Sequence, residues 1–131
     1  VDDSRSVEEL TADLQKHTHY NGRRVRGLRP WADDKDLFTA INHGEFTING
    51  FRNRDLQGLL YGATAKVPAE RRRRSAAISW KLCMLRAHGL IHKVPHTHRY
   101  QVTETGRATL VAVLTVARTS LNQLHHLPKA A

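Results

Sequence analysis

The chain has 131 residues, of which 40% are hydrophobic and 25% are charged, and its formal net charge is +9. This balance fits one folded soluble domain with flanking structure and excludes a disordered chain. The longest apolar run, residues 108–117, is too short to cross a bilayer, and no secretory signal is recognisable. The single cysteine, Cys83, excludes an internal disulfide and indicates a reducing compartment, so we expect a cytoplasmic protein. The first residue is Val1, which is compatible with an excised or processed piece of a larger protein.

Nearly all of the excess charge lies in residues 71–107. This segment holds nine Lys or Arg residues and one acid, Glu104, for a formal charge of +8, whereas residues 1–70 sum to −1. Charge localised in this way indicates a surface that binds a polyanion, and we expect that polyanion to be double-stranded DNA, which would place the protein at the nucleoid.

Residues 1–32 are expected to form a short helix and an arginine-rich connector. Apolar residues at helical spacing, ending at Leu14, predict a helix over 7–16. Residues 17–30 show no period and contain Gly and Pro, which is typical of a connector. This connector carries four arginines: Arg23, Arg24, Arg26 and Arg29.

Residues 33–104 are expected to form the core of the domain. The first expected element is a helix that begins at Asp33 and Asp34 and ends at Gly44, followed by a strand over 45–49. A second helix begins at the N-cap Asn53, and a loop over 62–70 follows it. The last elements are a helix over 75–88, ended by Gly89, and a hairpin of segments 90–94 and 99–103. The apolar residues expected in the core of these helices are Leu37, Phe38, Ile41, Leu56, Leu59, Leu60, Ile78, Leu82 and Leu85.

Residues 105–131 are expected to form a last helix, over about 105–124, and a loose tail. The apolar arc of this helix is wide for one small domain, which favours a homodimer formed through it. The alternative is that the N-terminal helix covers the same arc within one chain. The apolar positions are Leu110, Val113, Leu114, Ala117, Leu121 and Leu124, with Val111 and Val116 on the flanks.

Two short motifs resemble winged helix-turn-helix DNA-binding domains of the MarR, PadR and ArsR kind. The first is L-x-x-L-R-x-x-G-L-I over 82–91, and the second is R-Y-x-V-T-x-x-G-R over 99–107. The resemblance covers about residues 33–124 and identifies the fold better than the family. It implies a mainly helical fold with a small β-hairpin wing, a bacterial transcription regulator, and a recognition helix over 75–88 in the major groove.

The candidate DNA-binding residues lie at the start of one helix, along the next helix and on the hairpin. Small residues on the outward face of helix 75–88 would allow it to sit deep in the groove, with Ser79 able to bond a base edge. Trp80 has two interpretations, stacking on the nucleic acid or packing against the protein. The full set is Arg52, Asn53, Arg54, Arg71, Arg72, Arg73, Arg74, Ser75, Ser79, Trp80, Lys81, Lys93, His96, Thr97, His98 and Arg99.

We expect no enzyme activity, no metal and no cofactor. The chain has no nucleophile elbow, phosphate loop or metalloprotease motif, and its acids cluster where helices begin. The pairs His17/His19 and His96/His98 have metal-ligand spacing, but zinc sites need further convergent ligands. The function expected from the sequence is therefore a DNA-binding module. The alternatives are a docking domain of a larger recombination or mobile-element protein, an RNA-binding domain, and a basic protein-interaction module.

Overall fold

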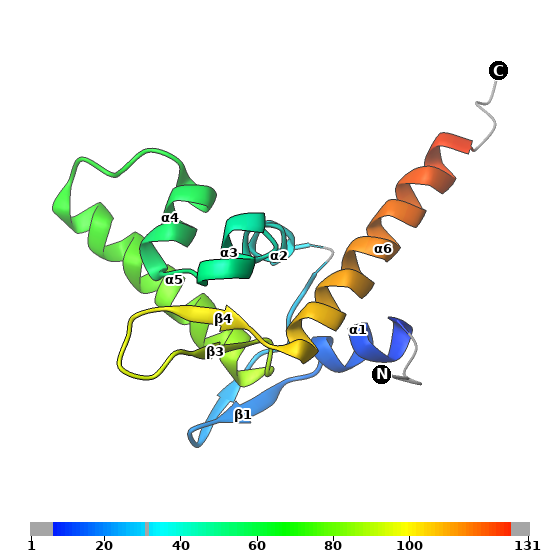
Figure 1. The fold of residues 1–131 in the computed structure, drawn as a ribbon, viewed down its shortest axis with the longest axis horizontal. Coiled ribbons are helices and arrows are strands. Elements are labelled where there is room, and N and C mark those ends of the chain that lie inside the picture. The colour runs from blue at the N-terminus through cyan, green and yellow to red at the C-terminus, as the bar shows by residue number, and fades with distance from the viewer. Residues whose placement is uncertain (1–6, 31, 127–131) are drawn as a thin grey trace.

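The computed structural model describes residues 7–30 and 32–126. It is mainly helical with small antiparallel hairpins, so the expected fold class is confirmed at this coarse level (Figure 1). The elements are α1 (Val7–Gln15), β1 (Thr18–Tyr20), β2 (Arg23–Val25), α2 (Lys35–Ile41), α3 (Gly44–Asn49), α4 (Asn53–Tyr61), α5 (Pro68–Ala87), β3 (Ile91–Lys93), β4 (Tyr100–Val102) and α6 (Glu104–His126).

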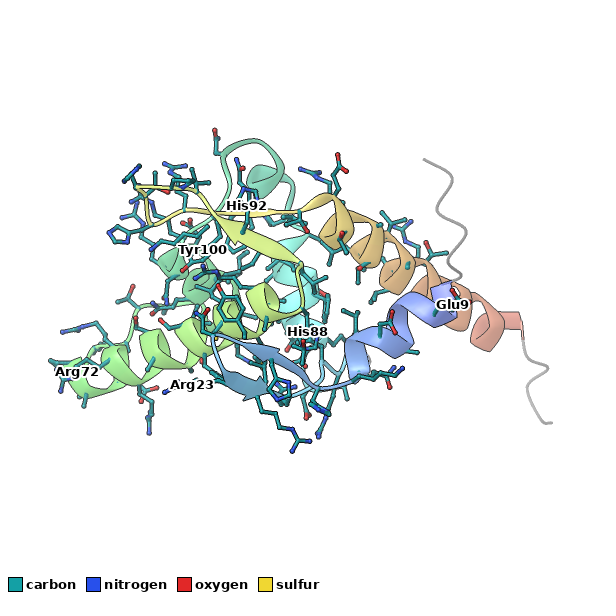
Figure 2. The ribbon with its side chains drawn as sticks, turned by 90° about the horizontal axis from the view of Figure 1, so that it is seen from below. Glu9, Arg23, Arg72, His88, His92 and Tyr100 are labelled. Atoms are coloured by element: carbon teal, nitrogen blue, oxygen red, sulfur yellow. The ribbon has the colours of Figure 1, made fainter. Side chains whose placement is uncertain are left out.

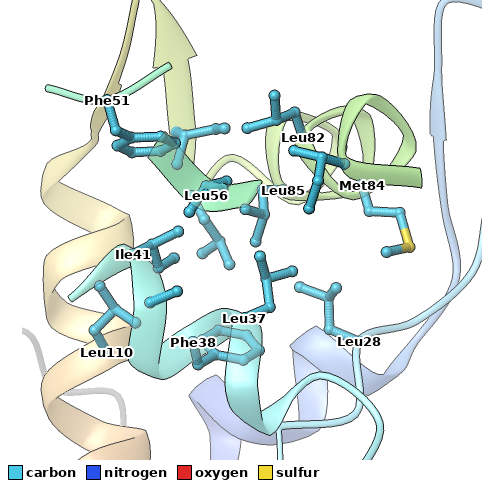
Figure 3. Close-up of a cluster of buried hydrophobic side chains, with 14 of the residues drawn as sticks. Leu28, Leu37, Phe38, Ile41, Phe51, Leu56, Leu82, Met84, Leu85 and Leu110 are labelled. Carbon is cyan, nitrogen blue, oxygen red and sulfur yellow. The ribbon is translucent and has the colours of Figure 1, made fainter. Parts of the chain in front are cut away.

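The hydrophobic core lies where α2, α4 and α5 meet (Figure 3). Ile78 and Leu85 of α5 and Leu56 of α4 are completely buried, which confirms the expected helix phases. The expectation for Leu59 is wrong: this side chain is 47% exposed, because it lies on the face of α4 away from the core, whereas its neighbour Leu60 packs against the core.

The long basic helix begins earlier than the sequence predicted. The expected start at Ser75 is wrong, because α5 begins at Pro68, after the extended residue Val67. Proline suits the first helical position, where its fixed φ is helical and its missing N–H has no intrahelical partner. The expected end is confirmed: Gly89 has a φ of +75°, and the Leu90 amide donates to the Leu85 carbonyl at 2.9 Å. The four arginines 71–74 therefore lie within the helix rather than before it.

The expected strand over 45–49 is also wrong, because these residues belong to helix α3. Extended backbone pairing occurs instead after α3, at Phe51. The amides and carbonyls of Phe51 and Tyr100 form two hydrogen bonds, of 2.9 and 2.7 Å. Phe46 is buried, and the centre of its ring lies 5.1 Å from that of Phe51. This apolar residue therefore packs α3 against the core and does not mark a strand. The hairpin expected after α5 is confirmed as β3–β4, in which Ile91 pairs with Val102.

The connector expected over 17–30 is wrong as well, because it contains a second antiparallel hairpin, β1–β2. Its two-residue turn is Asn21-Gly22, and both residues have positive φ, +51° and +76°. This is the turn chemistry that matches the twist of paired strands. The Asn-Gly dipeptide was therefore a hairpin signal, which the aperiodic composition around it obscured.

Helix α6 leaves the core and packs against α1 at its base (Figure 1). The expected helix over about 105–124 is confirmed, with Leu110 and Val113 buried, whereas Val111 is 65% exposed. Part of the apolar arc is thus covered by α1, as the alternative interpretation required. Within the described ranges, no helix combines the length and apolar character needed to span a membrane.

Candidate nucleic-acid interface

A hollow of about 370 Å³ lies where α4, α5 and the β3–β4 hairpin meet. Three separate segments of the chain contribute to it, and most of the contributors belong to the set expected from the sequence. The lining residues are Arg52, Asn53, Arg54, Ser79, Leu82, His98 and Tyr100. The fold therefore brings the start of one helix, the middle of the next and the hairpin loop onto one surface.

Asn53 ties α4 to α5 across this hollow. It does not cap its helix as expected, because the N-cap is Arg52, whose amide donates to the Asp55 carboxylate at 2.7 Å. The Asn53 amide nitrogen instead donates to the Ser75 carbonyl at 3.1 Å and to the Ser79 hydroxyl oxygen at 3.0 Å. Ser79 still has its own O–H to donate, so it is held in place with one donor left for a ligand.

Two arginines supply positive charge at the start of α4. Arg54 is exposed and borders the hollow. Arg52 is half-buried, and its Nε is a buried donor without a hydrogen-bond partner among the described residues. Leaving this buried donor unpaired costs free energy. Arg52 as a residue also borders the hollow, where its positive charge adds to that of Arg54.

Arg71 and Arg74 hold the loop between α4 and α5. Arg71 donates to the carbonyls of Ala65 and Lys66, at 3.0 and 3.1 Å. Arg74 donates to the Ala63 carbonyl at 3.0 Å and to Glu70 at 3.2 Å, and it lies 4.9 Å from the centre of the Tyr61 ring. Hydrogen bonds within the protein engage both guanidinium groups, although Arg71 stays exposed, and this gives both arginines a structural role.

Arg72 and Arg73 are exposed, and within the described part of the chain neither side chain bonds to the loop between α4 and α5. The Arg73 side chain is 78% exposed and pairs with Glu70, while Arg72 lies exposed at the far end of α5 (Figure 2). Among the described residues, no ion pair or hydrogen bond engages the Arg72 side chain. Arg72 is therefore the member of the run whose charge is fully available to a partner.

Trp80 lies on the outward side of α5 and is 43% exposed. It borders a second hollow, of about 730 Å³, with Lys16, His17 and Arg24 of the N-terminal region. The Trp80 side chain is thus partly packed against the protein, and stacking of its exposed part on nucleic acid stays a prediction. Lys81, one position on, is half-buried.

The β3–β4 hairpin presents Lys93, His96 and His98 to solvent. The loop is braced from within, because the Thr97 hydroxyl donates to the Val94 carbonyl at 2.8 Å. Arg99, one of the expected DNA-binding residues, donates to the Asn49 carbonyl at 2.9 Å and so fastens the hairpin to α3.

An ion pair between a buried carboxylate near α2 and a partly exposed arginine was missed by the sequence interpretation. Asp34 is completely buried, and its carboxylate accepts hydrogen bonds from both terminal nitrogens of Arg26, at 2.9 and 3.0 Å, and from the Arg29 amide at 2.7 Å. Burial disfavours the charged carboxylate, but these hydrogen bonds and the charges of Arg26 and Lys81 outweigh it, so the pKa of Asp34 is lowered. The consecutive aspartates indicated only a helix start, and nothing local identified the partner.

Within the described ranges 7–30 and 32–126, no group of three His, Cys, Asp or Glu residues is placed to hold a metal ion. Comparisons of the chain with protein-family models, with curated proteins and with solved structures find no match.

Proposed function

We propose that this chain is a winged helix-turn-helix module that binds double-stranded DNA, with α5 in the major groove and the β3–β4 hairpin as the wing. The order of α2, α4, α5 and a hairpin supports this proposal, as does the extended pairing of Phe51 with Tyr100 beside the hairpin.

The observation that carries the proposal is the hollow between α4, α5 and the hairpin. It gathers arginine, serine and histidine side chains from distant parts of the chain onto one exposed surface beside the outward face of α5. Ala76 and Ser79 keep that face of α5 narrow, so a groove can approach the helix backbone. Direct base contacts require this kind of close approach, while the surrounding cations would bind phosphates.

The role that we propose is that of a sequence-specific transcription regulator without catalytic activity. A homodimer through α6 would place two recognition helices on successive turns of the duplex. Docking of a larger recombination protein on DNA is the alternative role.

A salt titration tests the proposal. Binding of fluorescent duplex DNA, hairpin RNA and single-stranded DNA is measured by anisotropy between about 50 and 200 mM salt, a range over which phosphate-dependent affinity falls steeply. The proposal expects the duplex to bind most tightly, with a steep salt slope. Preference for RNA would indicate an RNA-binding domain, and the absence of nucleic-acid binding would leave an acidic protein partner; either outcome would overturn the proposal.

A further inference from the structure

The outward face of α5 lies between two hairpins rather than beside one. In Figure 2 the β3–β4 hairpin lies on one side of α5 and the β1–β2 hairpin on the other, and both β1 and β3 contact α5. Each hairpin has its own hollow against α5. The hollow beside the β3–β4 hairpin includes Ser79, and the hollow beside the β1–β2 hairpin includes Trp80.

The four arginines of the N-terminal region divide into two pairs with different surroundings. Arg26 is bound by Asp34, and Arg29 pairs with Asp33 at 3.0 Å. Arg23 and Arg24, on β2, are exposed, and within the described part of the chain neither forms an ion pair. The hairpin therefore presents two available guanidinium groups, and that of Arg24 borders the same hollow as Lys16 and Trp80.

The β1–β2 hairpin is held firmly against the domain. Val25 is completely buried, and the His88 ring nitrogen lies 2.9 Å from the Arg26 carbonyl oxygen, which joins the hairpin to the end of α5. The Arg86 guanidinium lies 5.5 Å from the centre of the Tyr20 ring. These contacts position Arg23 and Arg24 relative to α5, which a loose connector would not do.

We propose that the β1–β2 hairpin is a second DNA-binding arm, which contacts the backbone strand opposite the one contacted by the β3–β4 wing. A major groove about 12 Å wide admits one helix and is bordered by two sugar–phosphate backbones. A helix in that groove therefore has a backbone on each flank, and in this protein each flank of α5 carries a cationic hairpin. Arg24 binds a phosphate of the second strand, and the exposed part of Trp80 packs against its sugars. Arg23, on the other face of the hairpin, adds positive charge that attracts the same backbone. This inference rests on the proposed function.

The test compares two double variants that remove the same charge. Arg23→Ala/Arg24→Ala alters the hairpin, whereas Arg107→Ala/Arg118→Ala alters exposed positions on α6, away from α5. Duplex binding of each variant and of the wild type is measured over a range of salt. The hairpin variant is expected to bind more weakly, with a log–log slope shallower by about 0.9 for each phosphate that it no longer neutralises, and the α6 variant is expected to keep the wild-type slope.

Thermal unfolding of both variants checks that the fold is intact. If the alanine variant melts early, Arg23→Gln/Arg24→Gln retains the aliphatic stems and provides the same comparison. A Trp80→Phe variant gives a second reading, because the fluorescence change of the wild type on DNA binding should be absent from it.

The outcomes separate the two proposals. A wild type that does not bind duplex DNA would overturn the proposed function. A wild type that binds while the hairpin variant keeps its slope, or while both double variants weaken equally, would overturn the second arm and leave the proposed function standing.

Discussion

Asp34 shows how one buried side chain organises the N-terminal third of the protein. Its carboxylate joins the end of the β1–β2 hairpin, through Arg26, to the start of α2, and it also accepts from the Arg29 backbone. The interaction raises the pKa of Arg26, mainly through the hydrogen bond to Asp34, so each partner stabilises the charged form of the other. The Arg26 side chain is 39% exposed, which limits the energy of the pair through solvent screening.

We expect this ion pair to make stability fall in acid. The pKa of Asp34 is lower in the folded protein than in the unfolded chain, where it is about 3.9. Its contribution is therefore fully present above about pH 4 and is lost as the pH falls through the folded-state pKa. Asp34→Asn should cost about 1–3 kcal/mol at neutral pH and should show a smaller loss on acidification. Urea unfolding at several pH values measures both effects, and an unchanged pH profile in the variant would contradict this account.

Arg72 and Arg74 are expected to behave differently although they are two positions apart. Arg74→Ala should lower the free energy of unfolding by about 1 kcal/mol, because it removes the interactions with Glu70, Ala63 and Tyr61. Arg72→Ala should leave stability unchanged and weaken duplex binding. Thermal melting and duplex-binding anisotropy, measured on both variants, check this difference. Loss of stability in Arg72→Ala, with weaker binding only in Arg74→Ala, would contradict the prediction.

At the scale of elements, the β1–β2 hairpin depends on a close approach to α1. The Leu28 amide donates to the Leu14 carbonyl at 2.7 Å, and a Cβ atom at Gly27 would collide with the Gln15 carbonyl oxygen. Backbone cannot move aside as a flexible side chain can, so this position requires glycine.

Gly27→Ala should therefore displace the hairpin, at a cost of about 1–3 kcal/mol for the forced backbone shift. Hydrogen exchange should show faster exchange in β1 and β2, with α4 and α5 little changed. Gly44→Ala is the matched control, because a Cβ atom there meets nothing. Equal protection of the hairpin in both variants would mean that the contact at Gly27 does not position it.

Helix α5 is anchored in the core by its buried face. Leu85 is completely buried, so Leu85→Ala should reduce the free energy of unfolding by about 2–5 kcal/mol, because apolar burial is removed and a cavity is left behind. Chemical denaturation measures this loss. Leu59→Ala on exposed α4 surface should cost much less, and similar losses for the two variants would be inconsistent with the observed core.

At the scale of the whole molecule, the basic charge spreads over two hairpins and the helix between them. Dimerisation through α6 stays a prediction, since α1 covers part of the apolar arc while Val111 remains exposed. Sedimentation velocity over a range of concentrations measures the oligomeric state. If a dimer forms through α6, Val111→Glu should shift it to monomer; a dimer unaffected by this change would use another surface.

The sequence by itself determined the features that depend on neighbouring residues: the buried face of α5, its end at Gly89, the β3–β4 hairpin and the location of the charge. It also held the Asn-Gly turn of the β1–β2 hairpin. Only the tertiary structure decided which cations are available to a partner. In the sequence, Arg72 and Arg74 belong to the same run of four arginines and cannot be told apart. In the structure, Arg74 is hydrogen-bonded within the protein and Arg72 is not, because the carbonyls and carboxylates that bind an arginine come from segments brought together by folding. The placement of α5 between two cationic hairpins is also decided by tertiary structure, because the two hairpins lie far apart in the sequence and only folding brings both against α5.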